Sequence, residues 1–143
     1  MLVLFATTTL GACASTGPAP AAMPSLYKRL GRREGIATVV NDFTANMAAD
    51  TRVNDRFKDA KPAELEQFKT KLADQICEAS GGPCSYYGKD MKTAHKGMNI
   101  SEAEWGATIE NLVKALDKNN VDARSKQELL DALGPMKKDI VGQ

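Results

Sequence analysis

Residues 81–100 have the sequence GGPCSYYGKDMKTAHKGMNI and contain His95, the only histidine among the 143 residues of the chain. Met91 precedes His95 by four residues, so a single helical turn would place both side chains on the same side. Gly81-Gly82-Pro83 predicts that an earlier helix ends just before this stretch. A lone histidine is more often an ordinary core or surface residue than a metal ligand, and the spacing alone does not change that.

The periodicity of apolar residues predicts an all-α domain. From residue 25 onward apolar side chains recur three or four positions apart, and no stretch alternates as a half-buried strand would. Helices are expected to end near Asp50, to begin after Pro62, and to begin at Ser101, which forms a capping box with Glu104. The last helix is expected to bend at Gly134-Pro135. The apolar stripes are Ile36, Val39, Val40, Phe43 and Met47; Leu65, Phe68, Leu72 and Ile76; Trp105, Ile109, Leu112 and Leu116; and Leu129, Leu133, Met136 and Ile140.

The composition indicates one ordinary globular domain. Hydrophobic residues make up 43% of the chain and charged residues 26%, which excludes wholesale disorder. The formal net charge is only +1, and basic residues are mixed with acidic ones. Because nucleic-acid binding needs a concentrated basic surface, we expect no nucleic-acid partner.

The first residues predict an export signal. Residues 1–12 are mostly small and apolar and end at Leu10-Gly11-Ala12-Cys13, a string that resembles the lipobox at which bacteria lipidate a cysteine and cut before it. The apolar run is too short for a bilayer, which needs about 20 residues. We therefore expect a leader at 1–12, a flexible tether at 13–24, a domain at 25–143, and residence in the periplasm with membrane attachment only through a lipid on Cys13. The alternative is an ordinary cleaved signal, and the leader lacks the usual preceding Lys or Arg.

The order of residues around His95 resembles one family. Gly81-Gly82-Pro83, Tyr86, Gly88, Met91, Ala94-His95, Gly97 and Ile100 are similar to the loop and short proximal helix of group 1 truncated haemoglobins. Further matches are Ser25-Leu26-Tyr27 through Gly31, Val39-Val40-Asn41-Asp42-Phe43, Phe57, and Leu133-Gly134-Pro135-Met136. The resemblance covers about residues 25 to 141 and implies a two-over-two helical globin fold that holds one haem b.

The resemblance also implies which residues hold the cofactor. His95 would be the iron ligand, as a neutral imidazole whose other nitrogen meets a backbone or water acceptor. Tyr86, Met91, Ile100 and Trp105 would line the proximal side and edge of the porphyrin, and Phe57, Phe68 and Leu72 would cover the other face. Lys71 would lie at the rim and meet a haem propionate, or alternatively bind iron as a sixth ligand.

The expected distal pocket departs from the family pattern. It would consist of Val40, Phe43, Thr44, Phe68 and Leu72, with Thr44 where the family usually has a tyrosine that donates a hydrogen bond to bound oxygen. Phe68 and Leu72 offer no amide on the facing helix. We therefore expect oxygen to be held less firmly than in relatives with the tyrosine.

Cys77 and Cys84 bracket the Gly81-Gly82-Pro83 turn. An oxidising envelope would allow them to form a disulfide, and the alternative is two independent thiols.

The expected function is reversible binding of oxygen, nitric oxide or carbon monoxide, in oxygen transport or a role related to nitric oxide, with a reductase as partner. The alternatives are a nitric oxide dioxygenase, a peroxidase-type enzyme, or a six-coordinate electron-transfer haem that uses Lys71. The absence of a distal His and Arg pair argues mildly against peroxide chemistry.

Overall fold

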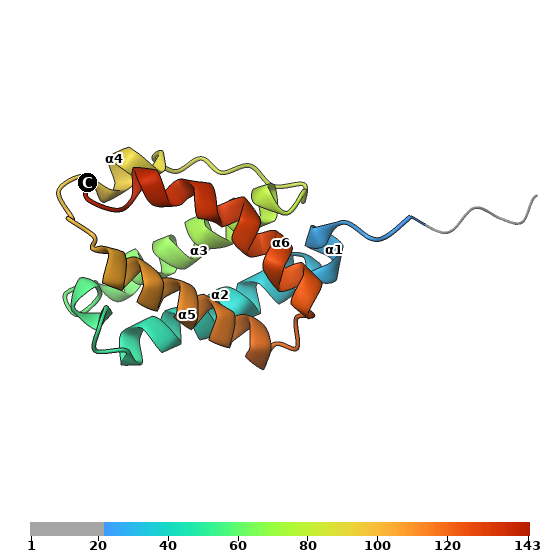
Figure 1. The fold of residues 1–143 in the computed structure, drawn as a ribbon, viewed down its shortest axis with the longest axis horizontal. Helices are drawn as coiled ribbons and strands as arrows, with labels where there is room; N and C mark the ends of the chain where they lie inside the picture. Colours follow the sequence, from blue (N-terminus) through green and yellow to red (C-terminus); the bar gives the residue numbers. More distant parts are fainter. Residues whose placement is uncertain (1–21) are drawn as a thin grey trace, which may run out of the picture.

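The computed structural model describes residues 22–143 (Figure 1). The expected leader, Cys13 and most of the tether lie outside the described residues. The domain begins at Ser25, whose hydroxyl accepts a hydrogen bond at the start of the first helix. The elements are α1 (Leu26–Arg29), α2 (Arg32–Ala49), the 3-10 turn η1 (Asn54–Arg56), α3 (Pro62–Ala79), α4 (Met91–His95), α5 (Glu102–Lys118), α6 (Ala123–Leu133) and the 3-10 helix η2 (Gly134–Asp139).

The predicted all-α class is correct. Within residues 22–143 there is no strand, and the only β-type contact is an isolated bridge between Ile100 and Val141. Helix α5 begins with the predicted capping box, in which the Glu104 amide donates to the Ser101 hydroxyl at 3.2 Å and the Ser101 amide donates to the Glu104 carboxylate at 2.8 Å. No helix in this part of the chain is long and apolar enough to cross a membrane.

The C-terminal end differs from the expected bent helix. Helix α6 ends at Leu133, and Gly134–Asp139 continue as a 3-10 helix. Pro135 has no backbone N–H and clashes with the preceding turn of an α-helix, so the chain changes its winding at this point.

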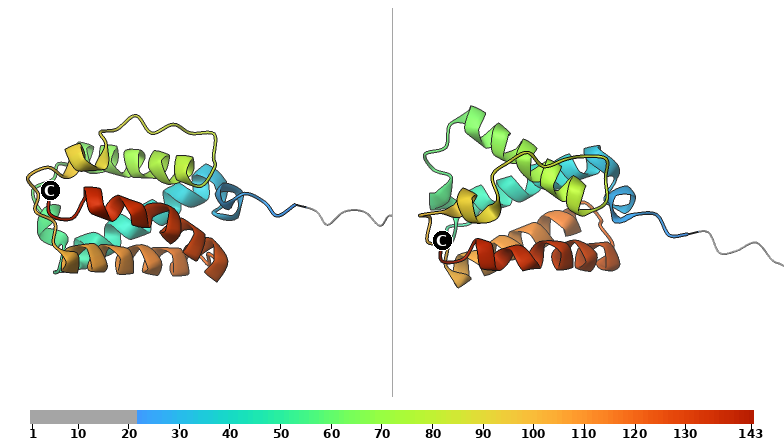
Figure 2. Two further views of the ribbon diagram at one scale, coloured as in Figure 1. Left: turned by 45° about the horizontal axis from the view of Figure 1, so that its top comes forward. Right: turned by 90° about the horizontal axis from the view of Figure 1, so that it is seen from above.

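The helices form two packed layers, with α2 and α3 in one and α5 and α6 in the other (Figure 2). Helix α2 packs against both α3 and α5, and α6 packs against α1 and α3. The most deeply buried side chains come from all four long helices and include Ile36, Ile76, Leu116 and Leu129, each at most 2% exposed.

The segment between α3 and α4 has no regular secondary structure and passes over α3 before it enters α4 (Figure 2). A disulfide joins Cys77 of α3 to Cys84 of this segment, with 5.8 Å between the Cα atoms. Gly82 is required beside it, because a Cβ there would lie 2.6 Å from the Cys77 Sγ. The disulfide therefore attaches the start of this segment to the end of α3.

Candidate functional site

A cavity of about 500 Å³ lies between the helix layers and α4. Its size falls within the ~300–1,000 Å³ that is usual for cofactor sites. Most of its wall is apolar. All nine residues expected to contact the cofactor line it: Phe57, Phe68, Lys71, Leu72, Tyr86, Met91, His95, Ile100 and Trp105. Residues 81–100, α3 and α5 therefore converge on one site.

His95 is the last residue of α4, and its ring is half-buried in the wall of the cavity. Its Nδ1 lies 2.7 Å from the Met91 carbonyl oxygen, which can only accept a hydrogen bond. In the neutral ring Nδ1 therefore carries the proton, and Nε2 keeps a lone pair for a ligand. This is the arrangement that orients an imidazole for binding a metal.

The side chain of Asp90 holds the start of α4. The Thr93 amide donates to Asp90 Oδ1 at 2.9 Å, and the Thr93 hydroxyl donates to Oδ2 at 2.6 Å. These hydrogen bonds hold the pKa of the Asp90 carboxyl below its usual range. The cap fixes the first turn of a helix that has only five residues.

Two expected distal residues do not line the cavity. Val40 and Thr44 are buried in α2, but the side of α2 that faces the cavity carries Phe43 and Met47. The Thr44 hydroxyl donates to the Val40 carbonyl at 2.7 Å, so it is already satisfied within the helix. A side chain as short as threonine stays on its own side of the helix, and the pocket receives no hydroxyl from α2.

Helix α3 also places an amide in the cavity wall, at Gln75, a position to which the sequence analysis gave no role. Gln75 lies three residues after Leu72, so it continues the row that faces the cavity. Its Nε2 lies 3.4 Å from the Met91 Sδ and 3.5 Å from the Met136 Sδ. The spacing from Phe68 and Leu72 could have identified it. Other lining residues that the sequence analysis did not assign to the cofactor site are Met47, Val53, Arg56, Lys89, Met98, Glu104 and Met136.

The cavity has charged side chains on its wall. Arg56 forms an ion pair with Glu104 at 2.7 Å and donates to the Met98 carbonyl at 2.8 Å. Hydrogen bonds from the Ser101 amide and from Arg56 hold the pKa of Glu104 below its usual range. Lys71 and Lys89 are exposed and form no ion pair within residues 22–143. Two lysines are therefore available to an anionic ligand group.

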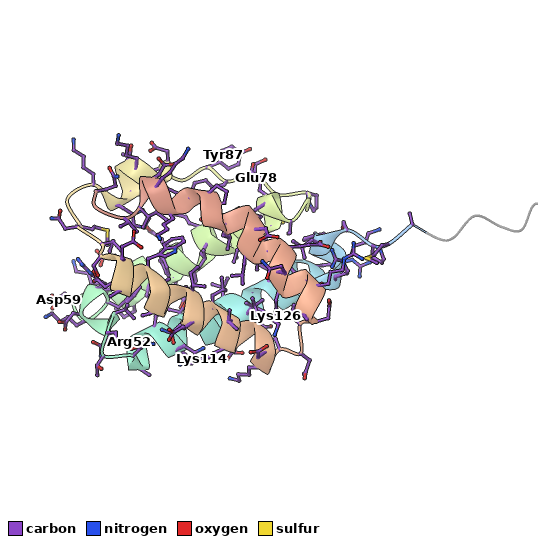
Figure 3. All side chains as sticks on the ribbon, viewed as in Figure 1. Arg52, Asp59, Glu78, Tyr87, Lys114 and Lys126 are labelled. Carbon is purple, nitrogen blue, oxygen red and sulfur yellow. A yellow bond between two sulfur atoms is a disulfide. The ribbon has the colours of Figure 1, made fainter. Side chains whose placement is uncertain are left out.

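Adjacent tyrosines of the segment before α4 have different environments. Tyr86 lines the cavity, and its hydroxyl donates to the Lys89 carbonyl at 2.8 Å. Burial raises the pKa of Tyr86, which keeps its phenol protonated. Tyr87 is 92% exposed and projects away from the protein (Figure 3). Only Tyr86 contributes to the site.

These features fit a haem. Its flat apolar ring matches the apolar walls, its two propionates match the exposed lysines, and its iron needs an axial donor such as the free Nε2 of His95.

Comparison with known proteins gives the family. A model of the bacterial-like globins matches residues 25–141. A group 1 truncated hemoglobin of Tetrahymena thermophila is 31% identical over 120 residues, which are 84% of this chain and 97% of the relative. The group 1 truncated hemoglobin GlbN of Mycolicibacterium paratuberculosis is 29% identical, over 81% of this chain and 83% of the relative.

Solved structures agree with these sequence matches. The Fe(III) form of truncated hemoglobin from Tetrahymena pyriformis superposes with a TM-score of 0.78 at 30% identity, covering 84% of this chain and all of the other. The 2/2 hemoglobin of Synechococcus sp. PCC 7002, in the cyanomet state with covalently attached heme, has a TM-score of 0.75 at 27% identity, over 82% and 98% of the two chains. The chain therefore belongs to the bacterial-like globin family and is related over most of its length to group 1 truncated haemoglobins.

Proposed function

We propose that this globin binds diatomic gases reversibly at the iron of a haem b, with His95 as the only protein ligand of that iron. The observation that carries the assignment is the 2.7 Å hydrogen bond between His95 Nδ1 and the Met91 carbonyl. That bond selects the tautomer whose Nε2 can bind a metal. The chain has no second histidine that could replace it.

The surrounding residues have separate tasks. Apolar side chains from α2, α3 and α5 exclude water from the cofactor. Lys71 and Lys89 would hold the propionates, and the phenol of Tyr86 secures the backbone at Lys89. The haem itself supplies the iron that binds the gas.

The pocket is expected to bind oxygen more weakly than relatives that have a distal tyrosine. Among the expected distal residues, Phe43, Phe68 and Leu72 carry no hydrogen-bond donor, and the Thr44 hydroxyl donates to the Val40 carbonyl. The Gln75 amide is directed at the thioethers of Met91 and Met136. One neutral hydrogen bond contributes about 0.5–1.5 kcal/mol, so its absence weakens oxygen binding about twofold to tenfold. Nitric oxide and carbon monoxide depend less on such a bond, which favours a role related to these gases.

Peroxidase activity fits the cavity less well. A peroxidase needs distal groups that move a proton, whereas the single arginine in the described cavity wall, Arg56, is paired with Glu104. A six-coordinate haem that uses Lys71 also fits less well, because an exposed ammonium must lose its proton and its hydration before it can bind iron.

We also propose that the protein works in the bacterial envelope, is anchored through a lipid on Cys13, and has a reductase partner that keeps the iron ferrous. The lipobox-like string at residues 10–13 supports the anchor. The Cys77–Cys84 disulfide is consistent with an oxidising compartment.

The test is His95→Ala, compared with the wild type by absorption spectroscopy of the ferric and dithionite-reduced protein. We expect the variant to lose stable haem, or to hold it loosely and recover a histidine-like spectrum when imidazole is added. Lys114→Ala is the matched control, since Lys114 lies on the far side of α5 (Figure 3) and does not line the cavity. An unchanged spectrum in His95→Ala would show that another residue binds the iron.

A further inference from the structure

We propose that Gln75 is a positioning residue that fastens the helix carrying His95 to α3 through the thioether of Met91. The effect on the iron rests on the proposed function, whereas the fastening of α4 can be measured without it. Gln75 carries no charge and has no hydrogen bond to the His95 ring within residues 22–143.

The geometry gives Gln75 two sulfur acceptors on two different elements. Its Nε2 lies 3.4 Å from the Sδ of Met91 on α4 and 3.5 Å from the Sδ of Met136 on η2. An amide nitrogen has two hydrogens, so both bonds can form at once. Helix α4 also packs against η2, so the amide of Gln75 lies where three elements meet.

No other hydrogen bond within residues 22–143 connects α4 to α3. The remaining hydrogen bonds of residues 91–95 join them to each other or to Asp90 and Met98, which flank the helix. A five-residue helix is too short to be stable alone, so its position depends on contacts with the rest of the fold. Gln75 supplies the polar part of those contacts.

The link from Gln75 to the iron ligand passes through one residue. The side chain of Met91 is held by Gln75, and the backbone carbonyl of Met91 receives the hydrogen bond from His95 Nδ1. A movement of Met91 would therefore turn the imidazole. The start of the same segment is tied by the disulfide to Cys77, two residues beyond Gln75 on α3. One turn of α3 thus anchors both ends of residues 84–91, the segment that passes over it (Figure 2).

Gln75 places a half-buried amide in a mostly apolar cavity wall. Burying one among apolar side chains is unfavourable unless it is hydrogen-bonded, and leucine would fill a similar volume without that requirement. Replacing Gln75 by leucine should therefore keep the cavity wall filled and the protein folded, while it removes the hydrogen bonds to Met91 and Met136. That separates a positioning role from a packing role.

The experiment measures amide hydrogen exchange and the iron–histidine stretching band in the purified haem-loaded protein. In Gln75→Leu we expect the Ala94 amide, which is bonded to the Asp90 carbonyl at 2.8 Å, to exchange about tenfold faster. The iron–histidine band of the reduced protein should shift or broaden. Gln67→Leu, at an exposed position of the same helix, is the matched control and should change neither measurement.

A double-mutant cycle with Met91→Leu tests the route. If Gln75 acts through the Met91 thioether, Gln75→Leu should have little further effect on Ala94 exchange in the Met91→Leu background. An equal effect in both backgrounds, or no change in exchange in Gln75→Leu itself, would overturn the proposal. Loss of the iron–histidine band in the wild type would instead overturn the ligand assignment, while the exchange data still decide the role of Gln75.

Discussion

Breaking the Cys77–Cys84 disulfide should lower the stability of the domain by an amount that follows from the size of the loop. The two cysteines are separated by 7 positions. On the chain-entropy model, closing so short a loop stabilises the folded state by about 2.5 kcal/mol at 25 °C. For a domain of this length that corresponds to a fall of roughly 10 °C in Tm.

The variant that isolates this effect is Cys84→Ser. Cys77 is fully buried, and keeping its thiol preserves the packing beneath Gly82. Cys84 is half-buried and receives a hydrogen bond from Arg33 Nη1 at 3.1 Å, which a serine hydroxyl can also accept. The free energy of unfolding is measured by urea denaturation, in a Cys13→Ser background that prevents thiol exchange.

The controls use reductant. Dithiothreitol should destabilise the parent protein to the level of Cys84→Ser and should leave Cys84→Ser unchanged. If parent and variant differ by less than about 0.5 kcal/mol, the cross-link does not restrict the unfolded chain as the loop-entropy argument requires. If peptide mapping of envelope-exported protein finds two free thiols, the disulfide is absent and the case for an oxidising compartment is weakened.

Three further outcomes are expected. Thr44→Val should leave the oxygen dissociation rate unchanged, because the hydroxyl is already bonded to the Val40 carbonyl, which keeps its helical hydrogen bond. Thr44→Tyr should slow oxygen dissociation about tenfold, because the longer side chain can bring its hydroxyl to the cavity. Stopped-flow measurement of both variants tests this. Lys71→Ala should leave a high-spin ferric spectrum unchanged at pH 7 and, by removing an ion pair with a haem propionate, speed haem transfer to apomyoglobin by up to about fivefold. A spectrum that turns from low-spin to high-spin would show that Lys71 binds the iron. Hydrogen bonds from Arg52, and then from Asn111, hold the pKa of Asp50 well below its usual range. The contribution of the Asp50 carboxylate to the free energy of unfolding is therefore present above pH ~4 and is lost as the pH falls further. Asp50→Asn should make the free energy of unfolding depend less on pH in the acid range, and an unchanged dependence would contradict this.

The local arrangement of residues 90–95 could be predicted from the sequence, whereas the iron-ligand role of His95 is a prediction that came from the family resemblance. Met91 and His95 share one turn, and Asp90 caps that turn, so the chain order nearly determines their arrangement. The long helices were predictable for the same reason, since their apolar stripes and their end signals at Pro62 and Ser101 lie within each helix.

The distal half could not be predicted in the same way. Which side of α2 faces the cavity depends on how α2 rotates against α3 and α5, and a difference of one residue separates Phe43, which lines the cavity, from Thr44, which does not. Periodicity marks Thr44 as bordering the buried side but does not say which neighbour it meets. Gln75 was missed because its partners, Met91 and Met136, are 16 and 61 residues away.

The sequence by itself therefore determined the helical class and the starts of α3 and α5, because hydrophobic period and capping act over a few positions. The candidate role of His95 came from the resemblance of the residues around it to one family. Only the tertiary structure decided which side chains meet across the cavity. It directed the Thr44 hydroxyl into its own helix, brought the Gln75 amide against two thioethers and left Lys71 and Lys89 without ion pairs within residues 22–143. These contacts depend on the rotation and packing of helices far apart in the chain, which local preferences do not specify.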